Sequence, residues 1–256
     1  MSENQKGFTL VELLVVLALS GIVTAAVYKS FAAQQQVYVA QDQVAGMQQD
    51  VRTALEIMVK ELRMAGYDPL GTADAGILVA TNSRIQFTAD HNRNGVLVTP
   101  GPPAENDPHE DITFSLRPEA DPNDDGIATV FPSELRRASW GVPQPLAENV
   151  EVLNFVYLDE NNAVMATPVT GTDLDRIRSV QVFIVVRSDK ADKSFDNTKS
   201  NPAFTNLLRD AIIADPSLAT ELPAHAVAQA LTWGPPNDGY RRRVLKTTVN
   251  CRNTGI

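Results

Sequence analysis

One carboxylate interrupts a long apolar run near the start of the chain. Between Phe8 and Tyr28 the only charged side chain is that of Glu12, which stands fifth in the run. A charge at the centre of a bilayer costs about 2.5–3.5 kcal/mol on insertion scales, and less near the interface. A plain membrane anchor gives no reason for that cost, so Glu12 indicates that the run does more than anchor the chain.

Two acidic loops contain the residue types that bind calcium. Residues 90–95 and 121–126 both follow the pattern D-x-[DN]-x-[DN]-G, which opens a calcium-binding loop. Neither has the bidentate glutamate that such a loop carries at its twelfth position. Clusters of Asp, Asn and Gly also form tight turns, and the turn is the favoured interpretation of both loops. The alternative, stronger for the second loop, is a calcium site formed by Asp121, Asn123 and Asp125.

No other group of side chains matches a catalytic pattern. The 3 histidines are scattered, and the chain contains no G-x-S-x-G, H-E-x-x-H, P-loop or C-x-x-C motif. Cys251 is the only cysteine and falls on the apolar face of an expected strand, where a buried hydrophobe is favoured over a nucleophile. We therefore expect a structural protein rather than an enzyme, with no cofactor apart from the alternative calcium ion.

The charge balance argues against nucleic acid as a partner. The formal net charge is -9, whereas general binding of nucleic acid depends on cationic contacts to phosphates. The run Arg241, Arg242 and Arg243 is interpreted as a solvated strand edge, with an anion or DNA site as the alternative.

The elements that carry Glu12 have the pattern of one long helix. All 16 prolines lie at Pro69 or later, so nothing breaks a helix before that point. At about 1.5 Å per residue, residues 8–28 span roughly 31 Å, which is enough to cross the hydrocarbon core of a bilayer. A cleaved secretory signal, with a small-residue site at residues 24–26, is one alternative. It is disfavoured because residues 1–7 contain Glu3 as well as Lys6.

A narrow apolar stripe continues the helix through the polar sequence that follows. Gly66 is then expected as a left-handed C-terminal cap, and Pro69 forbids continuation. The predicted helix, from Phe8 to about Ala65, would be roughly 87 Å long. Packing of the stripe on a sheet is favoured over a coiled coil, because charges at the flanking heptad positions are missing. The stripe consists of Val44, Met47, Val51, Leu55, Met58, Leu62 and Ala65.

Beyond Pro69 the period changes to that of β-strands. Short runs occur at residues 77–79, 84–88, 96–98 and 112–116, and stronger runs at residues 150–158, 177–187 and 243–251. A long helix followed by an antiparallel sheet is an α+β plan. An insertion at about residues 188–238 is expected to hold helices at residues 203–214 and 225–231. It is interpreted either as a partner-contact surface or as a solvated excursion.

The N-terminal residues Gly7-Phe8-Thr9-Leu10-Val11-Glu12-Leu13 resemble the type IV pilin signature. The resemblance implies that a prepilin peptidase cuts between Gly7 and Phe8, that Phe8 is then N-methylated, and that the apolar helix stays on the mature protein. It also implies that Glu12 pairs with the N-terminal amine of its own or a neighbouring subunit, which would fix axial register where the dielectric is low.

Several later segments resemble the PilW group of minor pilins: residues 61–69, 150–158, 178–187 and 249–253. The resemblance implies the pilin fold, with a leader (1–7), a transmembrane and filament-core helix (8–28), the amphipathic half of the helix (29–66) and a β-rich extracytoplasmic domain (67–256). It implies an inner-membrane protein with a cytoplasmic N-terminus and a periplasmic domain, which later reaches the pilus and cell surface.

The resemblance also implies a function and partners. The expected function is priming and assembly of the filament, with a place at its tip. The expected partners are other minor pilins, the major pilin, the prepilin peptidase and the inner-membrane assembly platform. Two alternatives stay open: a J-type minor pseudopilin of a type II secretion system, and a tip adhesin.

Overall fold

The computed structural model describes residues 7–97, 110–139, 142–192, 195 and 238–254. The chain divides into two compact units, Met1–Ala45 and Gly46–Ile256. The boundary falls inside the long helix. We call α1 residues 10–45 the exposed half and α1 residues 46–62 the packed half.

The predicted long helix is confirmed. Helix α1 spans Leu10–Leu62, 53 residues without a break. It starts two residues later than expected because Thr9 acts as its N-cap, and after Leu62 the chain forms turns. Gly66 has a φ of 74°, the left-handed conformation expected of a C-terminal cap, and its N–H donates to the carbonyl of Thr88 at 2.9 Å.

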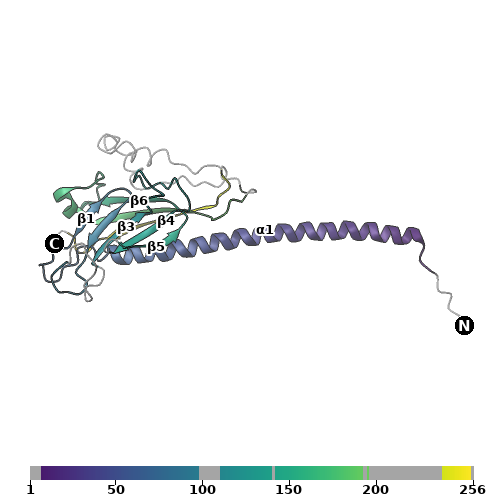
Figure 1. Cartoon of the computed structure of the whole chain (residues 1–256), viewed down its shortest axis with the longest axis horizontal. Coiled ribbons are helices and arrows are strands. Elements are labelled where there is room, and N and C mark those ends of the chain that lie inside the picture. The colour runs from purple at the N-terminus through teal and green to yellow at the C-terminus, as the bar shows by residue number, and fades with distance from the viewer. Residues whose placement is uncertain (1–6, 98–109, 140–141, 193–194, 196–237, 255–256) are drawn as a thin grey trace. The chain divides into compact units, whose positions relative to one another are not determined.

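Among the described residues, eight strands form two antiparallel sheets, and Figure 1 shows how they lie beside α1 within the second unit. The first sheet is a meander in the order β1-β2-β3-β4-β5, and the second has the order β6-β7-β8. The bounds of the first sheet are β1 Ile77–Ala80, β2 Ile85–Thr88, β3 Asp111–Leu116, β4 Glu134–Ser139 and β5 Val142–Glu148. Those of the second are β6 Val150–Leu158, β7 Ser179–Arg187 and β8 Arg242–Asn250. A 3-10 helix, η1, covers Gly171–Arg176.

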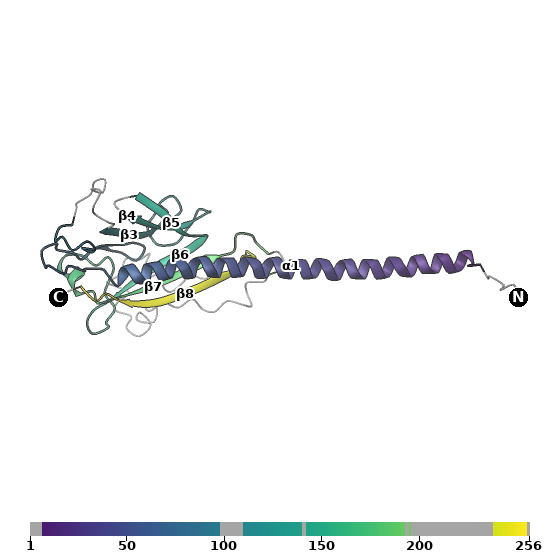
Figure 2. The same ribbon diagram turned by 90° about the horizontal axis from the view of Figure 1, so that it is seen from below.

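One apolar core joins the packed half of α1 to both sheets. Within the second unit, Figure 2 shows α1 running across the second sheet, with the first sheet on one side and β8 on the other. Val51, Met58 and Leu62 of the predicted stripe are fully buried in this core. The hydroxyl of Tyr157 on β6 also donates to the carbonyl of Thr81 at 2.8 Å, which links the two sheets. The stripe therefore packs on sheets, as predicted, and the architecture is the expected α+β plan of one long helix followed by antiparallel strands, here divided between two sheets.

The sequence patterns missed or misplaced several elements. β4 and β5 were not expected, and η1 was not expected either. The run predicted at residues 96–98 forms no strand at Val96 or Leu97, where the chain belongs to a turn-rich loop. The two helices predicted in the insertion lie outside the described residues.

The prediction of a solvated edge was wrong for Arg242 on β8, although β8 is the end strand of its described sheet and Arg243 is exposed. The Arg242 guanidinium is buried between the carboxylates of Glu151 and Asp238, with its side chain only 3% exposed. Burial opposes its charge, but hydrogen bonds to Asp238 and Glu151 raise the pKa of Arg242 above its usual value. Arg241 pairs with Asp192 at 2.8 Å. The pair of Arg241 and Asp192 joins the chain segment that leaves the second sheet after β7 to the segment that enters β8.

Candidate functional site

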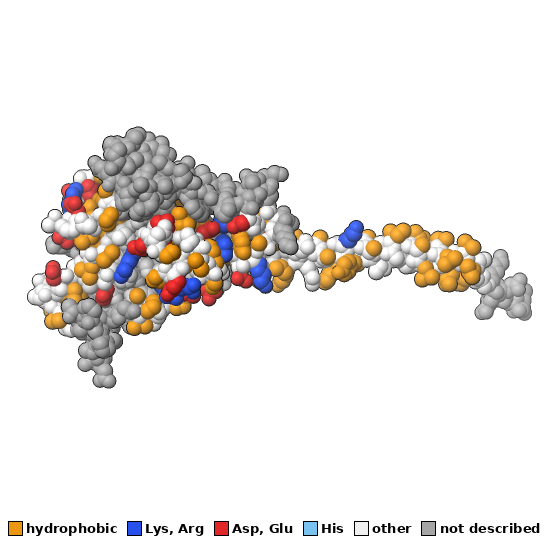
Figure 3. Space-filling model, turned by 45° about the horizontal axis from the view of Figure 1, so that its top comes forward, with side chains coloured by type: hydrophobic (Ala, Val, Ile, Leu, Met, Phe, Trp, Pro, Cys, Tyr) orange, Lys and Arg blue, Asp and Glu red, His pale blue; other side chains and the backbone are white. Residues whose placement is uncertain are grey.

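The chain presents apolar side chains around the whole circumference of the exposed half of α1 as far as Tyr28. Phe8 is 91% exposed and Leu17 is 61% exposed, and the same holds for other large apolar residues as far as Val39. Figure 3 shows these side chains gathered over the first part of α1. The most apolar window of α1 has a mean hydropathy of 2.5, and by length and composition this helix can cross a membrane. A surface of this kind needs lipid or other helices around it.

Glu12 closes a capping box at the start of the helix. Its Oε2 accepts hydrogen bonds from the backbone N–H of Thr9 and from the Thr9 hydroxyl, both at 2.9 Å. In return, Thr9 Oγ1 accepts from the N–H of Glu12 at 3.3 Å. The arrangement satisfies N–H groups that a helix start would otherwise leave without partners, and it places a carboxylate where the helix dipole favours negative charge.

The capping box leaves part of the carboxylate available. A carboxylate offers about four acceptor positions. Glu12 uses Oε2 for both bonds to Thr9, and Oε1 accepts no hydrogen bond from any described residue. No described cation pairs with Glu12. The group can therefore accept an ammonium without giving up its cap.

The two residues at the predicted cleavage site are accessible. Gly7 and Phe8 are both exposed, and a Cβ added at Gly7 would meet no atom within 4 Å. The structure thus gives a peptidase access to this bond, and cleavage between Gly7 and Phe8 stays a prediction.

The two acidic loops form the same hydrogen-bonded turn. In the first, Asp90 accepts from the N–H groups of Asn94 and Gly95, at 3.2 and 3.0 Å. In the second, Asp121 accepts from Asp125 and Gly126, at 3.1 and 2.8 Å. In both loops the residue that lies two positions before the glycine is left-handed: Arg93 has a φ of 63° and Asp124 a φ of 53°. This is the turn geometry that the composition favoured.

The geometry of the second loop bears on the calcium alternative. Burial raises the pKa of Asp121 to about 6, since the bonds from Gly126 and Asp125 only partly offset it and the carboxylates of Asp125 and Asp124 add repulsion. Asn123 donates to Asp125 at 2.8 Å, which occupies one of the expected ligand oxygens. Among the described residues there is no group of three or more His, Cys, Asp or Glu side chains suited to a metal ion. Calcium at Asp121, Asn123 and Asp125 stays a prediction.

Cys251 is a buried part of the folded domain rather than a reactive site. Cys251 is 4% exposed, and burial raises the pKa of its thiol to about 12, so the thiolate nucleophile is disfavoured. His91 lies in the first acidic loop, whereas His109 and His225 lie outside the described residues.

Sequence reasoning predicted Glu12 as a functional residue but missed the role of Thr9. The spacing Thr9-x-x-Glu12 at the start of an apolar run is the capping-box signal, so the sequence alone could have identified the role of Thr9. The groove that Lys60, Arg63 and Arg252 line at the end of α1 gave no signal, because its residues come from opposite ends of the folded domain.

Comparisons with known proteins agree with the structure. The family model for the prokaryotic N-terminal methylation motif matches residues 3–28, and that for the type IV pilus-assembly protein W matches residues 122–253, more than half of the chain. Among solved structures the chain is similar to a type IV-like pilin from Thermus thermophilus. The identity is 16%, the TM-score is 0.43, and the match covers 81% of this chain and 97% of that chain.

A search of curated proteins found no match. The family is nevertheless clear from the two matched motifs and their order. The prepilin motif coincides with the exposed helix that carries Glu12, and the second match covers the second sheet and the close of the chain. The chain belongs to the type IV pilus-assembly protein W family, as a minor pilin that carries a prepilin N-terminal methylation motif.

Proposed function

We propose that this minor pilin helps to prime and assemble the filament, with a place at its tip. The observation that carries the proposal is the apolar part of the exposed half of α1, up to Tyr28, whose one acidic side chain is the capped carboxylate of Glu12 with no described partner on Oε1. Such a helix is stable as a single element but leaves its apolar surface unburied. Packing beside the helices of other pilins would bury that surface, with van der Waals packing and interhelical polar contacts as the driving force because the helix comes from lipid rather than from water.

We further propose how the N-terminus is prepared. A prepilin peptidase cuts between Gly7 and Phe8 on the cytoplasmic side, and Phe8 becomes the methylated N-terminal residue. The new amine then stands next to the N-cap Thr9. The helix lies in the inner membrane, the folded domain lies in the periplasm, and the assembly platform draws the subunit into the fibre, where other minor pilins and the major pilin are its neighbours.

Glu12 would set the register between subunits. Its Oε1 can accept the amine of an adjacent subunit while Oε2 keeps the cap on Thr9. In a low-dielectric bundle an unmatched carboxylate is costly, so alignments that leave Glu12 without a cation are disfavoured.

Two substitutions separate the charge of Glu12 from its capping role. Glu12→Gln keeps an oxygen that can accept the Thr9 bonds but removes the charge, whereas Glu12→Ala removes both. We expect both variants to be cleaved normally and both to be strongly depleted from sheared pili, measured by immunoblotting of cell and filament fractions. Normal incorporation of Glu12→Gln would contradict the register role. Loss in Glu12→Ala alone would assign Glu12 to capping only.

The two alternatives differ from the proposal in what they affect. A J-type pseudopilin would be needed for secretion of folded proteins rather than for piliation or twitching, so deletion of the gene followed by both assays separates the systems. A tip adhesin would lose surface binding in loop variants whose piliation is normal. The family match favours the pilus role over both alternatives.

A further inference from the structure

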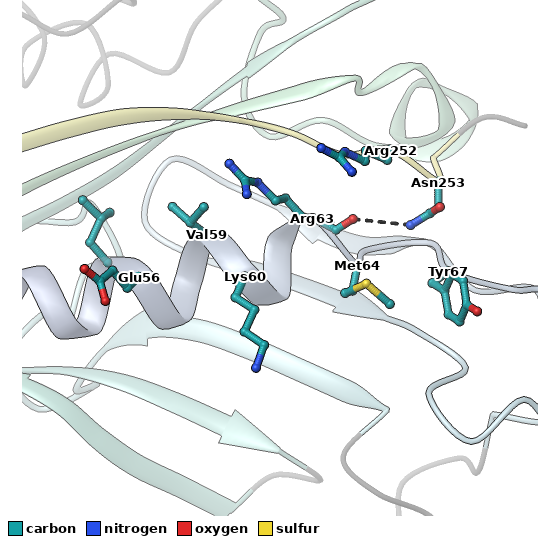
Figure 4. A pocket seen from close by; sticks show the side chains of 9 residues that line it. Glu56, Val59, Lys60, Arg63, Met64, Tyr67, Arg252 and Asn253 are labelled. Carbon is teal, nitrogen blue, oxygen red and sulfur yellow. Dashed lines mark hydrogen bonds between the residues drawn. The ribbon is translucent and has the colours of Figure 1, made fainter.

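Two neighbouring grooves of opposite charge lie where α1 meets the end of the chain. The first, of about 690 Å³, is lined by the last turns of α1 and by Arg252 and Asn253 (Figure 4). The second, also of about 690 Å³, is lined by the loop that follows α1 and by Asp175 of η1. Tyr67 and Asn253 line both, so the two grooves share one wall.

The first groove is cationic and has an apolar lining. Lys60, Arg63 and Arg252 are all exposed, and none forms an ion pair with a described carboxylate; Glu56 is the only acid on its wall. In Figure 4 the side chains of Arg63 and Arg252 both lie on the side of β8. The apolar part of the lining comes from Leu55, Val59 and Met64. The chain has a net charge of -9, yet these three cations lie together without a described carboxylate as partner. Such a cluster indicates a surface that can bind an anionic group.

The second groove is acidic and more polar. Asp68, Asp74 and Asp175 line it, and no Lys or Arg does. Burial opposes ionisation of Asp68, but N–H groups of Ala73, Thr72, Asp74 and Gly71 lower the pKa of this carboxyl, which holds it charged. Asn253 also donates to the carbonyl of Arg63 at 3.4 Å, so the shared wall is tied to the end of the helix.

We propose that the paired grooves bind one extended, charge-segregated segment of a neighbouring filament subunit. Carboxylates of that segment lie over Arg63 and Arg252, its apolar side chains contact Val59 and Met64, and its cationic end lies over Asp68 and Asp175. The order of charges along the segment, rather than its net charge, is what the two grooves select, because a wrong order places like charges together. Only the identity of the partner as a pilin rests on the proposed function.

A peptide segment fits this surface better than an anionic lipid surface or nucleic acid does. Both of those present negative charge alone, and the acidic groove beside Tyr67 would repel them. A peptide can carry both signs and also supply the apolar side chains that match Val59 and Met64.

The test measures binding of synthetic peptides to the full chain in detergent micelles by fluorescence anisotropy. The probe is a labelled peptide with alternating Asp and Leu in one half and Lys and Ser in the other. A peptide of the same composition with interspersed charges is the control. We expect the segregated peptide to bind at least about tenfold more tightly, a difference of about 1.4 kcal/mol.

Variants then locate the binding surface. The double variant Arg63→Glu with Arg252→Glu should bind the segregated peptide at least about tenfold more weakly. The same variant should bind a second peptide in which Lys replaces Asp in the half that contains Leu. The matched control is Arg84→Glu with Arg243→Glu, which reverses two other exposed arginines and should change binding less than about twofold. Circular dichroism checks that both double variants are folded.

Several results would overturn the proposal. These are equal binding of the two peptides, an unchanged affinity of the Arg63 and Arg252 variant, or equal losses in the control variant. Tighter binding to phosphatidylglycerol vesicles than to the peptide would assign the surface to lipid. Self-association that the Arg63 and Arg252 changes abolish, seen by sedimentation, would assign it to a second copy. None of these readouts depends on pilus assembly, so failure here leaves the proposed function standing.

Discussion

The two halves of α1 share one helix but bury their side chains differently. In the exposed half, apolar residues occupy every side as far as Tyr28, and large ones such as Leu13, Leu17 and Ile22 are more than half exposed. In the packed half, apolar residues form a stripe, and Val51 and Met58 are fully buried. The width of the apolar surface is what distinguishes them. A stripe can be covered by sheets of the same chain, whereas a fully apolar cylinder requires a lipid or helical environment.

Glu12 of the exposed half and Glu61 of the packed half differ in where their carboxylates find partners. Glu12 makes bonds only within its own first turn, to Thr9. Glu61 on the packed half instead accepts from Nε of Arg137 on β4, at 2.8 and 2.9 Å, and joins the helix to the first sheet. One carboxylate is satisfied by tertiary structure, and the other keeps capacity for a partner outside the chain.

The largest expected contrast comes from matched leucines. Leu62→Ala removes a fully buried side chain, and such changes cost about 2–5 kcal/mol of stability. Leu17→Ala truncates a side chain that is 61% exposed and should change the stability of the folded domain by less than about 0.5 kcal/mol. Guanidinium unfolding in micelles, followed by far-UV circular dichroism, measures both. Equal losses would mean that the two halves are not distinct.

Glycines give the second contrast. A Cβ at Gly66 would lie 2.9 Å from the carbonyl oxygen of Asn253, and the φ of 74° is strained for any L side chain. Gly66→Ala should therefore destabilise the domain by about 2 kcal/mol, since a left-handed residue alone costs roughly 1–2 kcal/mol. Gly21→Ala has nothing within 4 Å and should not destabilise the chain in the same unfolding assay. A neutral Gly66→Ala would refute the packing of the chain end against this turn.

Breaking the ion pair of the packed half should cause a smaller loss of stability. The side chains of Arg137 and Glu61 are 13% and 20% exposed, so Glu61→Gln should cost about 1–2 kcal/mol, between the values for surface and buried pairs. Glu56→Gln changes an exposed acid without an ion pair and should be close to neutral. A double-mutant cycle with Arg137→Ala should show that most of the loss at Glu61 depends on Arg137. Additive losses would contradict a direct interaction.

The cap of the exposed half gives the smallest effect. Thr9→Ala removes the N-cap oxygen and should weaken the first turn by about 0.5–1 kcal/mol, without changing stability of the folded domain. Hydrogen exchange in micelles should become faster at the amides of residues 10–13 and stay unchanged at Met58. Thr9→Ser, which keeps the hydroxyl, should exchange as the natural chain does.

The parts of the fold that the sequence could predict are those governed by local periodicity. Long α1 and the alternating strands β6, β7 and β8 were expected within a few residues of their observed bounds. β5 was missed because Pro143 and Pro145 argue against a strand. The sheet tolerates them because β5 is an end strand, where a missing N–H costs no bond within the sheet.

The rest of the fold could not be predicted from the sequence, because it depends on polar contacts between residues far apart in the chain. β4 was not expected from its sequence pattern, and its Arg137 pairs with Glu61, 76 residues away. Arg242 likewise is buried against Glu151, 91 residues away. Neither partner can be found from spacing, because only the folded sheets bring them together. The N-terminal site was accessible to sequence reasoning for the opposite reason, since Thr9 and Glu12 interact within one turn.

The central claim is that the exposed half of α1 is a processed assembly helix rather than an uncut anchor or a discarded signal. Mass spectrometry of the chain purified from its own host's membranes and pili tests this claim directly. We predict a mature protein that begins at Phe8, carries a single N-methyl group and retains the whole of α1. A chain that still begins at Met1, or one that begins after the small-residue site at residues 24–26, would contradict it.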